Sequence, residues 1–285
     1  MVKKLFYFIL LIASTSCNID WLGFVSPTSD TVEQRFSQSI AWNNTHPLPQ
    51  ILTPTDNYSF YVGTDIHTEK TVTNLTRFIT DMRNDSAAYF GFLIGDLVNE
   101  PDAFHTFARA LEFDTLTQLK NDTIFTTVGN HDLYFEQWND YKTYFGTATY
   151  WFEVKTPNFQ DLFISLDTGN GTLGISQLKW LREILASKRS NYRHCIVFSH
   201  TNLFKQDNSQ FPTSNMPIEE TLEITDLMQK NKVNLFLQGH DHNREITHYK
   251  GVLYIIVDAL RDDSDNAFYM IATCSDNVDY KFIAI

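Results

Sequence analysis

One pattern occurs five times in this sequence: a short apolar run that ends in a small cluster of Gly, Asp, Asn, Ser or His. The runs are rich in Phe, Val, Ile and Leu, and their length is typical of strands that are buried on both faces. They span residues 58–63, 88–94, 123–128, 194–198 and 233–237, and the clusters that follow them are Asp65-Ile66-His67, Gly95-Asp96, Gly129-Asn130-His131-Asp132, Ser199-His200 and Gly239-His240-Asp241-His242. The pattern predicts an α/β fold in which these polar side chains meet at the carboxyl ends of the strands.

The spacing of the clusters fits strands that are joined by crossover helices. Asp65 and Asp96 are 31 residues apart, and Asp96 and Asn130 are 34 apart, which leaves room for a strand, a helix and the next strand. Helices are expected over 69–84, 103–119, 176–187 and 218–230. The closely spaced apolar runs 252–257, 267–274 and 280–285 predict an antiparallel meander at the end of the chain.

The residue types in the clusters are those of a metal site. Asp65 and His67 are two residues apart, so on an extended strand both side chains leave the same face, and His240 and His242 repeat this arrangement. A pair of divalent cations needs about eight oxygen and imidazole ligands, including a carboxylate that can bridge. A single cluster of this kind is more often part of a turn. The prediction of a binuclear centre therefore depends on all five clusters, which contain five of the nine histidines.

In type, order and strand context, the five clusters resemble the calcineurin-like metallophosphoesterase superfamily. The resemblance extends from Tyr58 to the C-terminus and includes a strand pair within 145–167 followed by a Gln-Leu-x-Trp-Leu helix at 176–185. It implies an α/β fold, a four-layer α/β/β/α sandwich of two mixed sheets flanked by helices, over residues 58–285. It also implies two divalent metal ions, which would be Mn, Fe or Zn.

The resemblance implies a role for each residue of the site. One metal would take Asp65, His67, Asp96 and His242, and the other would take Asp96, Asn130, His200 and His240, so that Asp96 bridges. A metal-bridging hydroxide would be the nucleophile. His131 would be the general acid that faces the leaving group, and Asp132 would orient the His131 ring and keep it charged.

The net charge of the chain and the residues after the second cluster restrict the class of substrate that is expected. The formal net charge of −12, with no cluster of Lys or Arg, argues against a nucleic acid polymer as partner. Asn99 stands where purple acid phosphatases have a Tyr ligand, and Glu100 follows where protein phosphatases have Arg, so neither branch is expected. The basic residues nearest to the clusters in sequence are Arg244 and Lys205. A small or lipid-borne phosphate ester is therefore predicted, with a diester slightly favoured over a monoester.

Two further expectations concern the activity. The alternative to an enzyme is a non-catalytic metal-binding scaffold that binds a partner, but this chain retains His131 and every ligand position, which favours hydrolysis. The irregular stretch 201–217, which follows the strand that carries His200, is the expected substrate-shaping loop.

The N-terminal residues predict export. Lys3 and Lys4 precede an apolar core at 5–13 and small residues, which is typical of a secretory signal. The sequence Ser14-Thr15-Ser16-Cys17 resembles a bacterial lipoprotein cleavage site, so 1–17 would be a signal peptide and Cys17 would anchor the protein to a membrane through a lipid. Ordinary cleavage near Ser16, with release of the protein, is the alternative. Residues 18–57 are expected to form a tether, with a possible helix over 32–42, and Cys195 and Cys274 are expected to be buried thiols.

Overall fold

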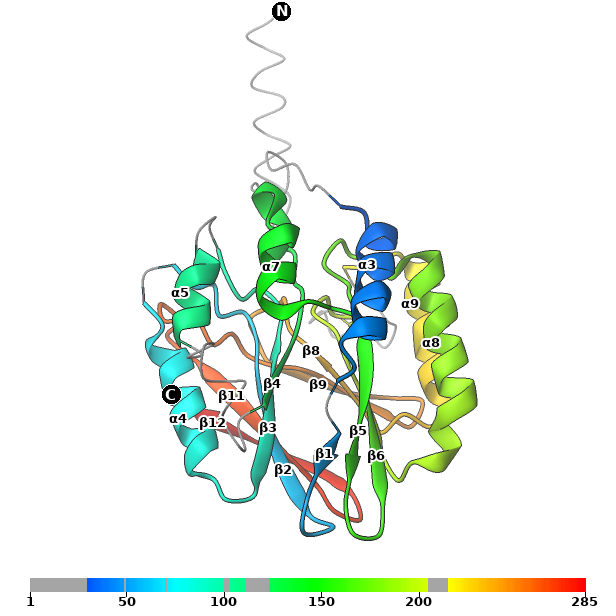
Figure 1. The fold of residues 1–285 in the computed structure, drawn as a ribbon. Coiled ribbons are helices and arrows are strands. Elements are labelled where there is room, and N and C mark those ends of the chain that lie inside the picture. Colours follow the sequence, from blue (N-terminus) through cyan, green and yellow to red (C-terminus); the bar gives the residue numbers. More distant parts are fainter. Residues whose placement is uncertain (1–29, 49, 70, 100–102, 111–122, 205–214) are drawn as a thin grey trace, which may run out of the picture.

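The computed structural model describes residues 30–48, 50–69, 71–99, 103–110, 123–204 and 215–285. Two β-sheets pack face to face, with α4 and α5 outside one sheet and α8 and α9 outside the other (Figure 1). This arrangement confirms the predicted four-layer α/β/β/α sandwich. The predicted signal peptide with Cys17, Glu100 and residues 205–214 of the predicted loop, Lys205 among them, lie outside the described residues.

The five-stranded sheet has the order β12-β11-β2-β3-β4. Its parallel strands β2 (Tyr58–Gly63), β3 (Ala88–Ile94) and β4 (Thr123–Thr127) are the first three predicted runs. The antiparallel strands β11 (Phe268–Cys274) and β12 (Val278–Ala284) complete the sheet.

The seven-stranded sheet has the order β1-β5-β6-β7-β8-β10-β9. Its strands are β1 (Ile51–Leu52), β5 (Tyr150–Lys155), β6 (Gln160–Ser165), β7 (Cys195–Phe198), β8 (Leu235–Gln238), β9 (Glu245–Tyr249) and β10 (Val252–Ile256). Strands β6, β7, β8 and β10 run parallel, so the ends of β7 and β8 lie at one edge. That edge carries the fourth and fifth clusters.

The predicted C-terminal meander is correct for its last two strands, because β11 and β12 pair antiparallel, but wrong for the first. Strand β10 pairs with β8 and β9 in the seven-stranded sheet, whereas β11 and β12 belong to the other sheet. Strand β11 lies between β2 and β12, and most of its side chains are buried. The alternation of apolar residues shows that a strand is buried, but it does not identify the neighbouring strand.

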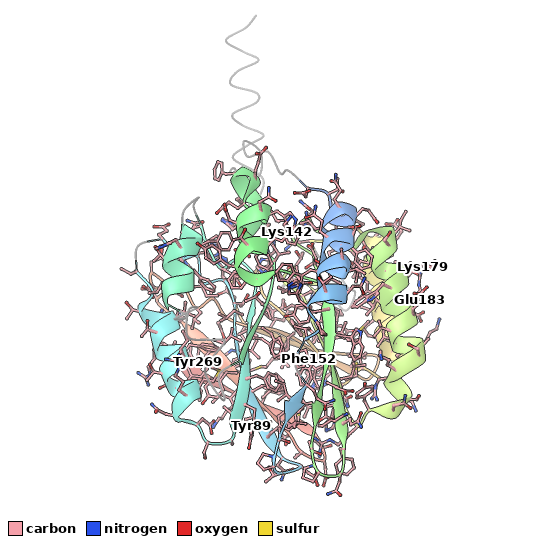
Figure 2. All side chains as sticks on the ribbon, viewed as in Figure 1. Tyr89, Lys142, Phe152, Lys179, Glu183 and Tyr269 are labelled. Atoms are coloured by element: carbon pink, nitrogen blue, oxygen red, sulfur yellow. The ribbon has the colours of Figure 1, made fainter. Side chains whose placement is uncertain are left out.

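Phenylalanine side chains fill the space between the two sheets. On β3, Phe90 and Phe92 point into this space, while Leu93 points toward the outer helices. Phe125 from one sheet stacks on Phe152 from the other with 4.0 Å between ring centroids, and Figure 2 shows Phe152 near the middle of the molecule. Many of the aromatic side chains of the protein are therefore part of the hydrophobic core.

Helices cover the outer faces of both sheets. Helices α4 (Thr73–Asn84), α5 (Ala103–Ala110) and α7 (Trp138–Phe145) contribute to the core beside the five-stranded sheet, and α8 (Gly174–Lys188) and α9 (Ile218–Lys230) cover the seven-stranded sheet. Two short 3₁₀ helices, η1 (His131–Glu136) and η2 (Arg189–Asn191), are also present. The helices predicted over 69–84, 176–187 and 218–230 are present, and that over 103–119 is described as far as residue 110.

The described part of the predicted tether, 18–57, contains the helix that was expected over 32–42. This helix, α3 (Val32–Thr45), begins with a capping box between Thr31 and Gln34. Arg35 on this helix is fully buried in an ion pair with Asp167, so the segment belongs to the folded domain. Polar and Pro-rich composition indicates exposure on average, and it does not reveal one buried charge pair. Among the described residues, no helix is long and apolar enough to cross a bilayer.

Candidate metal centre

The ligand clusters begin where the strands have already ended, and the ligands of the first, second and fifth clusters have left-handed backbone. The φ angles are 51° at Asp65, 47° at His67, 49° at Asp96, 76° at His240 and 60° at His242. The prediction that Asp65 and His67 extend from a continuing strand is therefore wrong, although Ile66 between them is buried. Non-glycine residues seldom adopt this conformation, and strain of this kind is concentrated at functional sites.

Hydrogen bonds hold the first three clusters against one another. The backbone N–H of Asp65 donates to Gly95 O at 3.1 Å, and that of His67 donates to Asp96 O at 3.0 Å. The third cluster lies so close that a Cβ at Gly129 would be 2.2 Å from Asp96 Oδ1 and 2.3 Å from Asp96 N. Only glycine fits at this position, because the contact includes backbone atoms that cannot rotate away.

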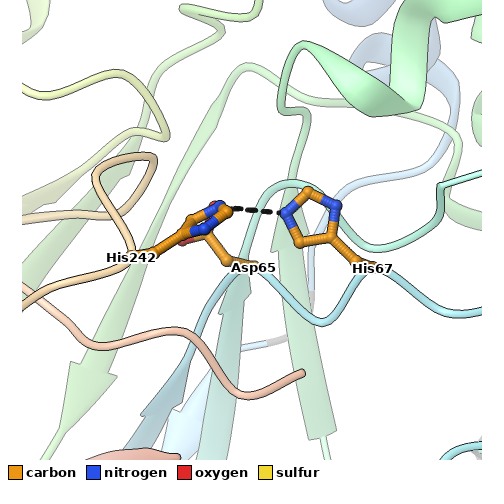
Figure 3. A group of neighbouring side chains, drawn as sticks. All are labelled: Asp65, His67 and His242. Atoms are coloured by element: carbon orange, nitrogen blue, oxygen red, sulfur yellow. Dashed lines mark hydrogen bonds and ion pairs between the residues drawn. The ribbon is translucent and has the colours of Figure 1, made fainter. Parts of the chain in front are cut away.

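Asp65, His67 and His242 form the first group of candidate ligands (Figure 3). The Nε2 atoms of the two imidazoles are 3.1 Å apart, and Asp65 Oδ1 lies 3.8 Å from His67 Nε2 and 3.4 Å from His242 Nε2. Asp65 Oδ2 accepts hydrogen bonds from His240 N and Thr64 Oγ1, both at 2.9 Å. Asp65 Oδ1 is buried and accepts no hydrogen bond, which a bound cation would compensate.

Asp96, His200 and His240 form the second group. His200 Nε2 lies 3.2 Å from Asp96 Oδ2 and 3.3 Å from His240 Nδ1. His200 Nδ1 is 3.0 Å from Ile94 O, so an N–H donated there directs the lone pair of Nε2 into the site. The Nδ2 atom of Asn130 donates to Tyr134 Oη at 2.9 Å, which orients the Asn130 amide.

Asp96 lies between the two groups. Its Oδ2 atom is 3.2 Å from His200 Nε2 and 3.8 Å from His67 Nε2, so one carboxylate oxygen faces an imidazole of each group. Its Oδ1 atom accepts the backbone N–H of His131 at 2.8 Å. This is the position that a bridging carboxylate requires. The structure thus brings together Asp65, His67, Asp96, His200, His240 and His242, with Asn130 beside them.

The charges in the site favour a cation. Burial raises the pKa of Asp65, but His242 and His200 outweigh that effect and lower this pKa to about 2. Burial would lower the pKa of His200, yet the adjacent Asp96 carboxylate raises it to about 10. Burial lowers the pKa of His67 and of His240 to about 4, so these rings are neutral at pH 7. Ionised carboxylates and neutral imidazoles are the forms that bind divalent metals, so Asp65, His67 and His240 already have the form that fits such ions, and a metal would displace the proton that Asp96 stabilises on His200.

His131 and Asp132 occupy different environments. His131 is partly buried, its ring centroid lies 4.6 Å from that of His67, and it can group with His67 and Asp96. The Asp132 carboxylate accepts the backbone N–H groups of Leu97, Val98 and Gly129 at 2.8, 3.1 and 2.9 Å. The prediction that Asp132 orients the His131 ring is therefore corrected: Asp132 ties the second and third clusters together. Burial and the charge of Asp96 raise its pKa to about 7.

The structure also brings a loop to the site that the sequence did not associate with it. The N–H of Ala259 donates to His242 O at 3.3 Å, and that of Leu260 donates to Thr64 O at 2.9 Å. Arg261 follows. The nearby Asp65 carboxylate raises the pKa of His242, and the positive charge of Arg261 opposes that shift. These residues carry no recognisable motif, so only the fold reveals them. Thr64 and Tyr134, which orient Asp65 and Asn130, were missed for the same reason.

Arg244, which is close to the fifth cluster in sequence, is directed elsewhere. Its Nε atom donates to Asp258 Oδ2 at 2.8 Å, and its guanidinium lies over the rings of Phe282 and Phe268 at 3.8 and 4.5 Å.

Comparison with known proteins agrees with this geometry. The family model of the calcineurin-like phosphoesterases matches residues 58–244. Among solved structures, GAP50, described as the anchor in the inner membrane complex of Plasmodium, has a TM-score of 0.59 and 14% identity over 81% of this chain and 85% of that chain. A purple acid phosphatase from yellow lupin seeds has a TM-score of 0.57 and 15% identity over 80% of this chain and 52% of that chain. A putative 5′-nucleotidase from Staphylococcus aureus has a TM-score of 0.52 and 13% identity over 80% and 54%.

At these identities the structural likeness shows the fold alone. The chain spans about half the length of the purple acid phosphatase and of the putative nucleotidase. Among curated proteins, no sequence matches this chain significantly.

Proposed function

Because the chain belongs to the calcineurin-like phosphoesterase family of metal-dependent phosphoric ester hydrolases, we propose that it hydrolyses a small or lipid-borne phosphate ester, with a diester slightly favoured. The observation that carries this proposal is the convergence of imidazole nitrogens on two buried carboxylates, one of which, Asp96, faces both ligand groups. Nothing in this arrangement calls for a Ser or Cys nucleophile.

Each residue of the site has a proposed role. Asp65, His67, Asp96 and His242 would hold one divalent ion, and Asp96, Asn130, His200 and His240 would hold the other. When bound, such ions supply a water of lowered pKa and neutralise phosphoryl oxygens. The two ions would be Mn, Fe or Zn, and elemental analysis of the purified protein would identify them. His131, whose ring lies beside that of His67, would donate a proton to the leaving oxygen.

Charge at the rim of the site supports the preference for a monoanionic diester. Arg261 is the cation that the 258–261 loop places beside the site, and its guanidinium is already paired with Asp263 through both Nε and Nη2. Arg244 is paired with Asp258. A monoester brings about two negative charges and a diester only one, so a rim with compensated cations fits the diester better.

The competing function is a metal-binding scaffold that binds a partner. One observation favours it, because a Plasmodium protein of similar fold is described as an anchor. The test is to purify the mature protein with Mn, Zn or Fe, measure its metal content, and assay matched aryl phosphate monoesters and bis(aryl) phosphates. We expect close to two metals per chain, turnover, and a higher kcat/KM on the diester.

The matched variants are Asp96→Asn and Asp81→Asn. Asp96→Asn should reduce both metal occupancies and abolish turnover, because it removes the carboxylate that faces both groups. Asp81 accepts hydrogen bonds from Tyr269 and Arg77 away from the site, so its variant should keep both properties. Two bound metals without turnover on any ester would favour the scaffold. A tenfold preference for the monoester would contradict the diester proposal.

We further propose export and lipid anchoring through Cys17, as the N-terminal sequence predicts. Cys17→Ser should yield uncleaved precursor or a soluble form. Mass spectrometry that finds an unmodified N-terminus beyond Cys17 would instead show simple secretion.

A further inference from the structure

Helix α3 precedes the residues that match the family model, yet it holds a loop beside the metal centre. Arg35 Nε donates to Asp167 Oδ2 at 2.7 Å and Nη2 donates to Asp167 Oδ1 at 2.9 Å, with both side chains fully buried. Arg35 Nη1 also donates to Asn170 Oδ1 and to Asp30 O, both at 2.6 Å. The guanidinium thus fixes the start of the loop after β6 in one geometry.

This loop contacts the segment that carries His200. The backbone N–H of Thr201 donates to Thr168 Oγ1 at 2.8 Å, and Thr201 Oγ1 donates to Thr168 O at 2.7 Å. Thr168 directly follows Asp167, which pairs with Arg35. Thr201 directly follows His200, which is a proposed metal ligand. Displacement of Thr168 would therefore move the backbone of a proposed metal ligand.

The same loop packs against the third cluster. A Cβ at Gly169 would lie 2.9 Å from Gly129 O, so the two backbones are in close contact, and Gly129 directly precedes Asn130. Asp167 Oδ1 also accepts the N–H of Gly169 at 3.1 Å. The carboxylate that pairs with Arg35 therefore orients the residue that supports the Asn130 segment.

We propose that Arg35 is a positioning residue, which holds the segments of Asn130 and His200 in place through the loop 167–169. The inference rests on the proposed function in one respect, because those segments are assigned to the same metal. The other group is supported elsewhere: Asp65 N bonds to Gly95 O, and Ala259 N bonds to His242 O. Loss of the Arg35 geometry should therefore affect one metal more than the other.

The first test compares Arg35→Lys with Glu33→Gln. Lysine keeps the positive charge but loses the paired donors, so the chain should still fold. Glu33 lies on the same helix, but its Oε1 accepts the N–H groups of Ile175 and Ser176 at the start of α8. Both variants weaken an attachment of α3, and only the first one alters the loop.

In a titration of metal-free protein with Mn²⁺, Arg35→Lys should weaken one of the two sites by roughly tenfold or more and change the other by less than about threefold. Glu33→Gln should leave the affinities of both metal sites unchanged, even if it lowers the melting temperature as much as Arg35→Lys does. Unchanged affinities in Arg35→Lys, or equal losses in both variants, would overturn the proposal.

A second measurement does not depend on metal. In metal-free protein, amide hydrogen exchange at Thr201 and at His131 should be roughly tenfold faster in Arg35→Lys and unchanged in Glu33→Gln. Exchange at the wild-type rate in Arg35→Lys would refute the positioning role. A wild-type protein that binds no metal would refute the proposed function, and the exchange rates would still decide whether Arg35 holds these segments.

Discussion

At the scale of single residues, a second contact fixes the direction of several proposed donor atoms. Asp65 uses Oδ2 for two hydrogen bonds and so directs Oδ1 at the imidazoles, and His200 uses Nδ1 for Ile94 O and so directs Nε2 at Asp96. Contacts of this kind reduce the motion that a metal would otherwise have to restrict, and their removal commonly weakens binding. The chemistry of the site therefore depends on Thr64 and Ile94 as well as on the ligands.

The first residue-scale prediction separates the roles of His131. His131→Ala should keep its metals but lose roughly 10² to 10⁴ in rate on esters with poor leaving groups, because protonation of the leaving oxygen is lost. The loss should shrink on an activated aryl ester, which departs without a proton. Steady-state kinetics on both substrates, with metal analysis, measure this. Since His131 can also group with His67 and Asp96, loss of metal in the variant would make it a ligand instead.

The second residue-scale prediction concerns Arg261. Arg261→Gln should raise KM by about two- to threefold with kcat nearly unchanged, because Asp263 already compensates most of the charge that the guanidinium offers to a bound ester. Arg77 forms an exposed ion pair with Asp81 on α4, so Arg77→Gln is the control and should behave as wild type. Inhibition by inorganic phosphate should weaken in parallel with KM. Equal KM values in both variants would exclude contact between Arg261 and the substrate.

At the scale of elements, sequence periodicity located the strands well. The predicted limits of β2, β3 and α9 agree with the structure, because each apolar or amphipathic run is bounded by polar residues, Gly or Pro. Strand β9 was missed because its side chains are at most half-buried, so no apolar run marks it. The partners of strands β10, β11 and β12 are set by contacts between distant segments, and sequence periodicity does not reveal such contacts.

The ligand positions were predicted for sound chemical reasons but with the wrong backbone. Asp65 and His67 are directed into the same site by left-handed backbone at both residues. An extended strand would also have placed side chains two residues apart on one face, so the prediction was right about the direction for the wrong reason. Asp132 was assigned to His131 because the two are adjacent in sequence, whereas the fold places backbone N–H groups around its carboxylate. The residue types indicated a metal site. The hydrogen-bond partners of each side chain could be identified only from the three-dimensional structure.

The element-scale prediction tests the contact between the second and third clusters. Gly129→Ala should lower stability by about 1 to 3 kcal/mol and weaken metal binding, because the new methyl group would meet Asp96. Gly251→Ala is the control: its φ is 79° and a Cβ there meets nothing within 4 Å, so it should cost about 1 to 2 kcal/mol through strain alone and spare the metals. Urea unfolding and metal titration measure both effects. Full metal affinity in Gly129→Ala would contradict the close packing.

At the scale of the whole molecule, the domain includes more than the residues that match the family model. Helix α3 and strand β1 lie before residue 58, and they pack on α8 and on β5. Arg35 places a positive charge where Asp167 would otherwise be buried alone. The N-terminal segment is therefore part of the cooperative unit, and a chain that lacked it would expose surface and leave a buried carboxylate unpaired.

The last prediction compares two truncated proteins, one that begins at Asp30 and one that begins at Tyr58. The first keeps α3, β1 and the buried ion pair, and it should unfold in a single cooperative transition with the midpoint of a chain that begins at Asn18. The second should lose at least about 3 to 5 kcal/mol, the usual cost of removing one partner of a buried ion pair, and it would also lose the packing of α3. Urea unfolding followed by circular dichroism measures the difference. Asp167→Asn in the shorter protein should recover part of the loss, because a neutral amide is less costly to bury than an unpaired carboxylate. Equal stability of the two truncated proteins would show that residues 30–57 are a tether after all.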